Sequence, residues 1–247
     1  MKQTNIIMGM PITVEIVDDR AADAIADTFS YFTAVDARFS TYKDDSEISR
    51  INQGLPKAEW SEEMQQVLAL CAETKQYTNG YFDIRHSGKL DPSGLVKGWA
   101  VLQAAEQLAA RGYTDFYIEA GGDIEARGHN EHGEPWQVGI RNPFQIEEII
   151  QVIALQDQGV ATSGTYIRGQ HIYNPHAAGQ TIEEVRSLTV IGPTVYDADR
   201  FATAAFAMGR AGIAFIERLD GFEGYMVDDT KTATLTSGWE TYVTTPA

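Results

Sequence analysis

Apolar residues recur every three or four positions in several segments of the chain, which is the spacing of one helix face. In residues 20–38, for example, Ile25, Phe29 and Phe32 fall on the same face. Ser46 is a good N-cap for a short helix that runs through Ile51. The same reasoning predicts further helices over residues 61–78, 94–111, 197–208 and 211–219.

Shorter apolar runs between turn residues predict strands. Pro11, near the middle of the first run at residues 6–16, predicts that this strand is broken or lies at a sheet edge. Helices and strands are mixed without regular alternation, so the pattern predicts an α+β fold with a mainly antiparallel sheet. No linker or repeat divides the chain, so residues 1–247 are expected to form one domain. The other strands are predicted at residues 116–118, 124–126, 136–140, 149–155, 159–162, 166–173 and 187–191, with a final hairpin at 224–236.

The composition is that of an ordinary globular protein, with 43% hydrophobic and 22% charged residues. The longest apolar runs have the length of strands, so membrane insertion is not expected. The segment Met1-Lys2-Gln3 leads directly into a strand, without a signal-peptide core or a lipid-acceptor cysteine, which favours a cytoplasmic protein. The net charge of −16 argues against nucleic-acid binding. The single Cys71 lies on an apolar helix face and is expected in the core.

The first chemically informative segment runs from Asp91 to Ala100, at the start of a predicted helix. Its Ser93, Gly94 and Lys97 are expected at the helix entrance, where unpaired N–H groups and the helix dipole attract anions. A lysine in the first turn opposes the dipole, which indicates that the anion comes from a ligand. The alternative is a serine cap, a flexible glycine and a solvated lysine.

A second informative segment is the predicted helix at residues 197–208. Asp199 and Thr203 are four positions apart and therefore share one face, beside Ala, Phe and Met residues. A carboxylate and a hydroxyl that point the same way can hold a hard cation such as Mg²⁺. In the alternative interpretation, Asp199 favours the helix N-terminus and Thr203 bonds back to its own helix.

These segments belong to a longer ordered set of motifs. In chain order they are Met8-Gly9-Met10, the segment Phe39 to Asn52, Gly80-Tyr81-Phe82-Asp83, Lys97-Gly98, Glu119 to Ile124, Ala161-Thr162-Ser163-Gly164, His171-Ile172-Tyr173-Asn174-Pro175, and Asp199 with Thr203. In this order they make the chain similar to the FAD:protein FMN transferases of the ApbE family, along nearly its whole length. The resemblance implies the T-fold-like α+β architecture of these transferases.

The chain also departs from the family pattern. Only Ile84 to Leu90 separates Asp83 from Asp91, where most relatives carry a long insert, so the chain resembles a compact variant. Thr165 and Asn174 stand where the family usually has aspartate. Both changes are close to His171 in sequence, so they bear on the transfer step more than on flavin binding.

The resemblance also implies a set of site residues. Asp199, Thr203 and the backbone carbonyl of Gly94 match metal positions, so Mg²⁺ is the expected cofactor. His171 is the expected proton acceptor, since an unperturbed imidazole titrates near neutrality. Solvent-exposed loops account for the other histidines, including His86. The positions expected to contact FAD are Met8, Tyr42, Tyr81, Phe82, Asp83, Asp91, Lys97 and Tyr173.

Three functions are compatible with these residues. The leading expectation is an enzyme that moves FMN from FAD to a Ser or Thr hydroxyl of a partner flavoprotein and releases AMP. A metal-dependent FAD pyrophosphatase would use the same residues with water as the acceptor. A flavin-binding protein without turnover is the third, motivated by Thr165 and Asn174. The sequence is compatible with a homodimer.

Overall fold

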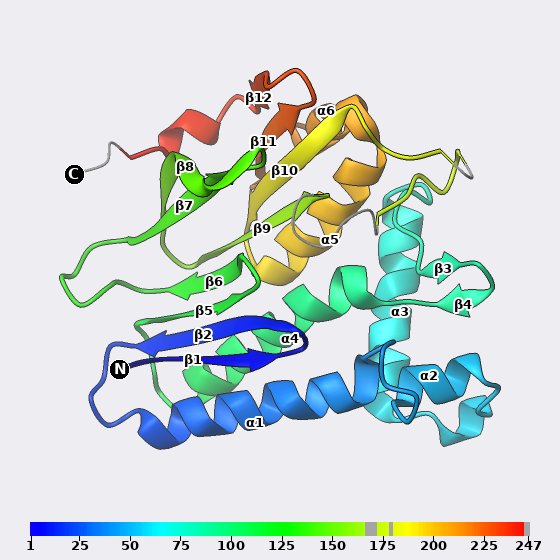
Figure 1. Ribbon diagram of the computed structural model, residues 1–247. Coiled ribbons are helices and arrows are strands. Elements are labelled where there is room, and N and C mark those ends of the chain that lie inside the picture. Colours follow the sequence, from blue (N-terminus) through cyan, green and yellow to red (C-terminus); the bar gives the residue numbers. More distant parts are fainter. Residues whose placement is uncertain (166–171, 178–179, 245–247) are drawn as a thin grey trace.

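The computed structural model describes residues 1–165, 172–177 and 180–244 (Figure 1). The helices lie within a few residues of their predicted positions, and Ser46 caps α2 as expected by accepting a hydrogen bond from the Ser49 N–H. Within the described ranges, no helix is both long and apolar enough to cross a membrane. The helices are α1 (Ala22–Phe39), α2 (Glu47–Asn52), α3 (Glu62–Tyr77), α4 (Ser93–Ala110), α5 (Val195–Ala207) and α6 (Gly212–Ile216), with short 3₁₀ turns at Lys57–Glu59, Gly209–Ala211 and Trp239–Thr241.

Eight strands form one fully antiparallel sheet, in the order β1-β2-β5-β6-β9-β10-β11-β12. Two further antiparallel pairs, β3–β4 and β7–β8, stand outside it. The strands are β1 (Lys2–Ile7), β2 (Met10–Ile16), β3 (Arg85–His86), β4 (Lys89–Leu90), β5 (Phe116–Ala120), β6 (Asp123–Arg127), β7 (Trp136–Asn142), β8 (Gln145–Leu155), β9 (Gln158–Gly164), β10 (Val185–Gly192), β11 (Glu223–Asp228) and β12 (Ala233–Leu235). The prediction of an α+β fold with a mainly antiparallel sheet is confirmed.

Two predicted strands differ in detail from the structure. The first is broken, but at Met8 and Gly9 rather than at Pro11: these two residues have positive φ and form the turn of the hairpin β1–β2, and Pro11 pairs with Ile6 inside it, in a strand that is not at the sheet edge. In the strand predicted at residues 166–173, residues 166–171 lie outside the described part of the chain, and Ile172 and Tyr173 are not in a strand.

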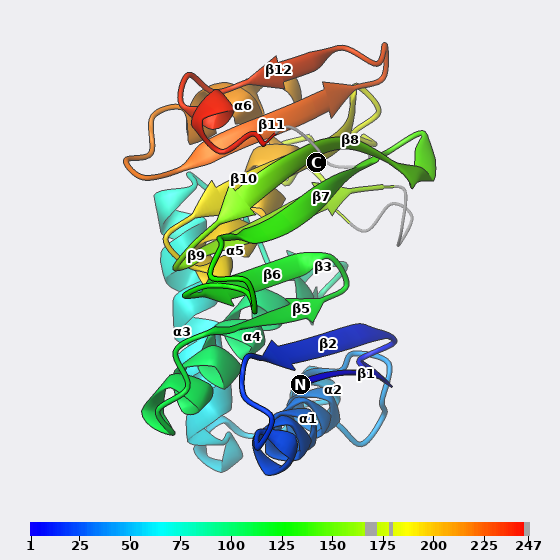
Figure 2. The same cartoon turned by 90° about the vertical axis from the view of Figure 1, so that its left-hand side faces the viewer.

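The two faces of the sheet are covered differently. Figure 2 shows the helices on one face and the β7–β8 hairpin on the other. Strand β10 is buried on both faces for this reason: Leu188 and Val190 belong to the cluster with α5 and α6, whereas Ile191 belongs to the cluster that contains Trp136 of β7. A third cluster joins the first strands to α1–α4. Cys71 is buried there, as predicted, and burial raises the pKa of its thiol to about 12.

Helix α5 begins directly against β6 and β9. The side chain of Glu125 is fully buried and accepts a hydrogen bond from the Val195 N–H at 2.6 Å. Gly159 lies opposite Glu125 in the β6–β9 ladder, and a Cβ there would fall 1.9 Å from the Val195 nitrogen. Only glycine therefore allows the helix to start this close to the sheet.

The buried Glu125 makes stability depend on pH. Burial raises the pKa of this carboxyl from 4.5 to about 7, against the opposing effects of the Val195 N–H and the Arg127 guanidinium. At a pH between these two pKa values, Glu125 holds a proton in the folded protein and has lost it in the unfolded chain. The contribution of Glu125 to the free energy of unfolding therefore falls as pH rises. Glu125→Gln keeps an acceptor for Val195 and removes the titration. We expect urea unfolding to show that the stability of Glu125→Gln relative to wild type increases from about pH 5 to pH 8.

The exposed Glu131 provides the control, since Glu131→Gln should leave the pH profile of stability unchanged. Parallel profiles for wild type and Glu125→Gln would contradict the assignment of this titration to Glu125.

Candidate functional site

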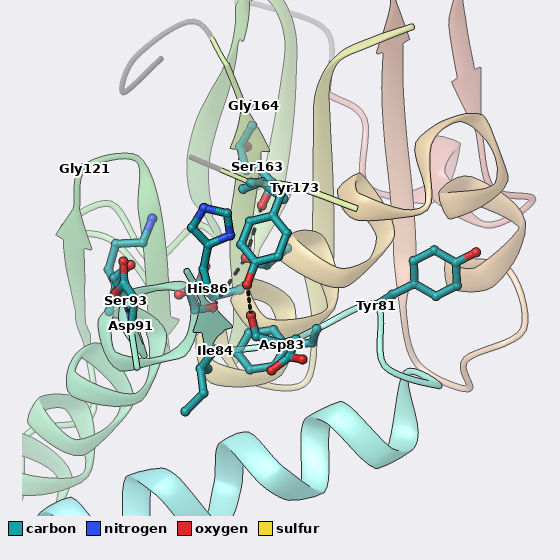
Figure 3. Close-up of a pocket in the computed structure, with 17 residues that line it drawn as sticks. Tyr81, Asp83, Ile84, His86, Asp91, Ser93, Gly121, Ser163, Gly164 and Tyr173 are labelled. Carbon is teal, nitrogen blue, oxygen red and sulfur yellow. Dashed lines mark hydrogen bonds between the residues drawn. The ribbon is translucent and has the colours of Figure 1, made fainter. Parts of the chain in front are cut away.

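One open cleft gathers most of the residues that the sequence predicts to be functional (Figure 3). It encloses about 1070 Å³, including space open to solvent, between the N-terminus of α4, the middle of α5, the end of β9 and the β3–β4 hairpin. Nine of the predicted residues line it, namely Tyr81, Phe82, Asp83, Asp91, Gly94, Lys97, Tyr173, Asp199 and Thr203.

Three predicted residues are not among those that line the cleft. Met8 occupies the turn between β1 and β2 and is half-buried. Tyr42 follows α1 and is 97% exposed. His171 lies outside the described residues. Functional roles for these three residues stay predictions.

The entrance of α4 forms one wall of the cleft. Asp91 accepts a hydrogen bond from the Ser93 N–H at 3.0 Å, and Ser93 is the first helical residue rather than the cap. Lys97 is not a solvated surface lysine, since only 14% of its side chain is exposed and its Nζ lies 2.6 Å from Asp123 Oδ2. The buried Asp123 also accepts from the Thr162 N–H at 3.2 Å. Lys97 is therefore held against the β5–β6 turn and the end of β9.

Oxygen atoms from three elements converge where α4 meets α5. The Thr203 hydroxyl of α5 lies 3.4 Å from the Gly94 carbonyl oxygen and 3.5 Å from the Ser163 hydroxyl of β9. One turn earlier, the buried Asp199 accepts a hydrogen bond from the Gly98 N–H at 2.9 Å. These donors are all hard oxygens, a set that suits Mg²⁺. Within the described ranges, no cluster of three His, Cys, Asp or Glu residues offers a competing metal site.

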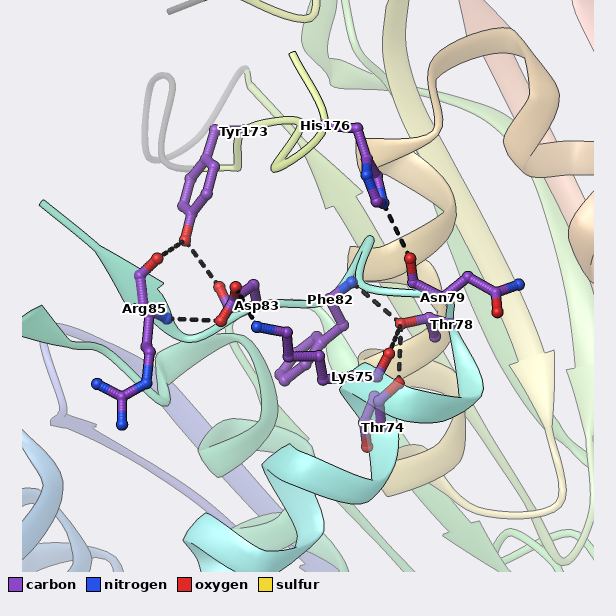
Figure 4. Close-up of polar contacts among 9 residues, drawn as sticks. All are labelled: Thr74, Lys75, Thr78, Asn79, Phe82, Asp83, Arg85, Tyr173 and His176. Carbon is purple, nitrogen blue, oxygen red and sulfur yellow. Dashed lines mark hydrogen bonds and ion pairs between the residues drawn. The ribbon is translucent and has the colours of Figure 1, made fainter. Parts of the chain in front are cut away.

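A short loop, residues 172–177, closes the other side of the cleft and is tied to the segment after α3 (Figure 4). The Tyr173 hydroxyl donates to the Asp83 and Arg85 carbonyls at 2.8 and 3.0 Å. Burial first, and then the charges of Asp83 and Asp91, raises the pKa of Tyr173 to about 12, so the hydroxyl stays a donor at neutral pH. His176 Nε2 lies 2.9 Å from the Asn79 carbonyl oxygen.

The segment between Asp83 and Asp91 folds as the small β3–β4 hairpin. Its turn residues Ser87 and Gly88 both have positive φ. The Asn52 side chain donates to the Leu90 carbonyl at 2.9 Å and accepts from the Leu90 N–H at 2.8 Å, which braces β4 against the end of α2. This contact gives a structural role to the last residue of the motif at residues 39–52.

Sequence reasoning missed His86 as a cleft residue. His86 is exposed, as expected, but it lines the cleft and its ring centroid lies 4.3 Å from that of Tyr173. Its two-residue strand is too short to show periodicity, so the hairpin gave no sequence signal. Ile84, Ser93, Gly121, Thr162, Ser163, Gly164 and Ile172 also line the cleft.

The motif order and the fold can be compared with known proteins. A sequence profile of the ApbE family matches residues 8–88 and 84–226, which together span most of the chain. The chain belongs to the ApbE family.

Individual ApbE relatives agree with this assignment. A protein of Haemophilus influenzae named FAD:protein FMN transferase is 27% identical, and the alignment covers 84% of this chain and 82% of the relative. One of the same name from Klebsiella pneumoniae is 24% identical, over 87% of this chain and 80% of the relative.

Solved ApbE structures share the fold. The flavin transferase ApbE of Vibrio cholerae superposes with a TM-score of 0.83 at 22% identity, covering 98% of each chain. The ApbE protein of Thermotoga maritima superposes with a TM-score of 0.86 at 20% identity, covering 99% of each chain.

The approach of α4 to α5 depends on Gly98. A Cβ at this position would lie 2.7 Å from the Asp199 Cβ and 2.8 Å from the Val195 carbonyl oxygen. We expect Gly98→Ala to lower the free energy of unfolding by about 1–3 kcal/mol through overpacking, although alanine favours a helix. Urea denaturation would measure this. Gln107→Ala, on the exposed face of the same helix, should be nearly neutral. A Gly98→Ala variant as stable as wild type would contradict the close contact.

Proposed function

We propose that this ApbE protein transfers FMN from FAD to a Ser or Thr hydroxyl of a partner flavoprotein, with Mg²⁺, and releases AMP. The observation that carries the proposal is the convergence of nine predicted residues, from distant parts of the sequence, in one cleft. Relatives that align with most of the chain carry the name FAD:protein FMN transferase. The direct test is to incubate the protein with FAD, Mg²⁺ and candidate acceptors, and to look for AMP, free FMN and an FMN-sized gain in acceptor mass.

In the proposed reaction, the acceptor oxygen forms a bond to the FMN phosphorus while the bond from that phosphorus to the AMP oxygen breaks. The hydroxyl proton passes to a base, and AMP leaves with the bridging oxygen. Such a transfer depends on alignment of the reacting groups and neutralisation of phosphate charge. We assign the base to His171, on the motif His171 to Pro175.

The charges around the cleft support the metal. Among the described residues, Asp83, Asp91 and Asp199 line it, against one lysine, Lys97, which is already paired with Asp123. An anionic pyrophosphate would meet net negative charge there unless a cation were present. The Asp199 carboxylate, the Thr203 hydroxyl and the Gly94 carbonyl would hold Mg²⁺, which when bound neutralises charge that develops on the phosphates.

The α4 entrance is suited to the phosphates themselves. The first N–H groups of a helix attract anions, and Lys97 lies on the same wall. Its ammonium is fixed by Asp123 and so requires little reordering to receive a phosphate oxygen.

Asp199 tests the metal assignment. We expect Asp199→Ala to abolish Mg²⁺-dependent FMN transfer, because it removes the only carboxylate of the proposed donor set. Asp197→Ala is a matched control, because Asp197 lies on the same helix but does not line the cleft and instead pairs with Arg200. Release of AMP would be followed over a Mg²⁺ titration, with circular dichroism to check folding. Full activity of folded Asp199→Ala at limiting Mg²⁺ would exclude this metal site.

His171 separates transfer from hydrolysis. We expect His171→Asn to slow transfer to a protein hydroxyl by about 10²–10⁴-fold, the usual contribution of a general base. FAD binding should survive, since the phosphate-binding residues are on α4. Flavin fluorescence and intact acceptor mass would be measured on one preparation. Loss of both FAD binding and FMN transfer would indicate that His171 is structural. Retention of both would place the base elsewhere.

The same experiment decides between the proposed transferase and a pyrophosphatase. The departures at Thr165 and Asn174 are close to His171 in sequence, where they would affect acceptor use. Wild-type protein that yields AMP and free FMN but never modifies an acceptor would establish hydrolysis instead.

A further inference from the structure

Two aromatic side chains from different segments pack against each other at the cleft. The His86 and Tyr173 rings have centroids 4.3 Å apart and planes inclined by 40°. Both residues line the cleft, and Figure 3 shows the imidazole projecting into it beside the phenol ring. The pair is built from the β3–β4 hairpin on one side and residues 172–177 on the other.

Both members of the pair belong to segments that are fixed by hydrogen bonds. The Tyr173 hydroxyl is engaged by the Asp83 and Arg85 carbonyls, so the residue presents its ring rather than its hydroxyl to a ligand. His86 pairs with Lys89 across the hairpin, and Asn52 braces the neighbouring Leu90. The Tyr173 ring is thus preorganised, and the His86 ring packs against it from a fixed backbone, which lowers the entropic cost of binding against the pair.

We propose that His86 and Tyr173 form a stacking ledge that binds one planar ring of the nucleotide, either the flavin or the adenine. This rests on the proposed function, because FAD is the ligand that supplies the rings. Different walls of the cleft would then bind different parts of FAD. The α4 entrance and Lys97 would bind the phosphates, and the aromatic pair would bind one ring. Aromatic side chains bind flat heterocycles through their π faces with little dependence on the particular base.

The ledge stands beside the motif that carries the assigned base. His86 is on the short hairpin between Asp83 and Asp91, and its partner Tyr173 follows His171 by two positions. A ring on the ledge would therefore lie next to the segment that carries the assigned base. His86 is then a substrate-contacting residue supplied by the short hairpin.

The test compares ring loss with ring replacement. Binding of FAD, FMN and AMP would be measured by calorimetry for wild type, His86→Ala and His86→Phe. His132→Ala is the matched control, since His132 is exposed and does not line this cleft. Stacking of a base on an aromatic residue predicts a loss of about five- to a hundred-fold in affinity for His86→Ala, for FAD and for at least one of the two halves. His86→Phe should bind within about threefold of wild type.

The mononucleotide that loses affinity identifies the ring on the ledge. Unchanged binding of all three ligands by His86→Ala overturns the ledge, and so does a loss in His86→Phe as large as in His86→Ala. If wild-type protein turns over FAD and His86→Ala binds FAD, FMN and AMP normally, the ledge is contradicted and the proposed function is not. Wild-type protein that binds no FAD removes the proposed function and the ledge with it.

Discussion

The close contact between α4 and α5 is the constraint on which the site depends. The Gly98 N–H donates to Asp199, and the absence of a Cβ at Gly98 allows the two helices to meet at backbone distance. This contact brings the Gly94 carbonyl of one helix to the Thr203 hydroxyl of the other. The start of α5 is fixed independently by Glu125 and Gly159 on the sheet. Two glycines and two buried carboxylates therefore set the position of the oxygen cluster.

The cleft combines an acidic lining with an anionic proposed substrate. In an acidic protein with a net charge of −16, a pyrophosphate requires local compensation. Lys97 cannot supply it alone, since Asp123 already offsets its charge. Under the proposed function, a divalent cation would supply this compensation. Binding of substrate and cation would then be mutually dependent, which is a form of thermodynamic linkage.

Much of the fold could be predicted from the sequence, because α1 and α3 are long enough to show their apolar spacing and Ser46 and Ser61 are strong caps. The order of the strands could not be, since β6 pairs with β9 across the intervening β7–β8 hairpin. Ordered motifs located most residues that line the cleft. They did not reveal that Lys97 pairs with Asp123 or that His86 faces Tyr173, because those contacts join segments far apart in sequence and depend on tertiary packing.

The hairpin between Asp83 and Asp91 has a consequence for how members of this family can vary in size. Its strands are fixed at their bases by Asn52 and by the Tyr173 hydroxyl, while its tip at Ser87 and Gly88 is exposed. Chain added at such a tip costs little loop-closure entropy and displaces no buried group. The tip is thus a site where an insertion, even one the size of a recognition module, could be placed beside the cleft without disturbing the helices that form it.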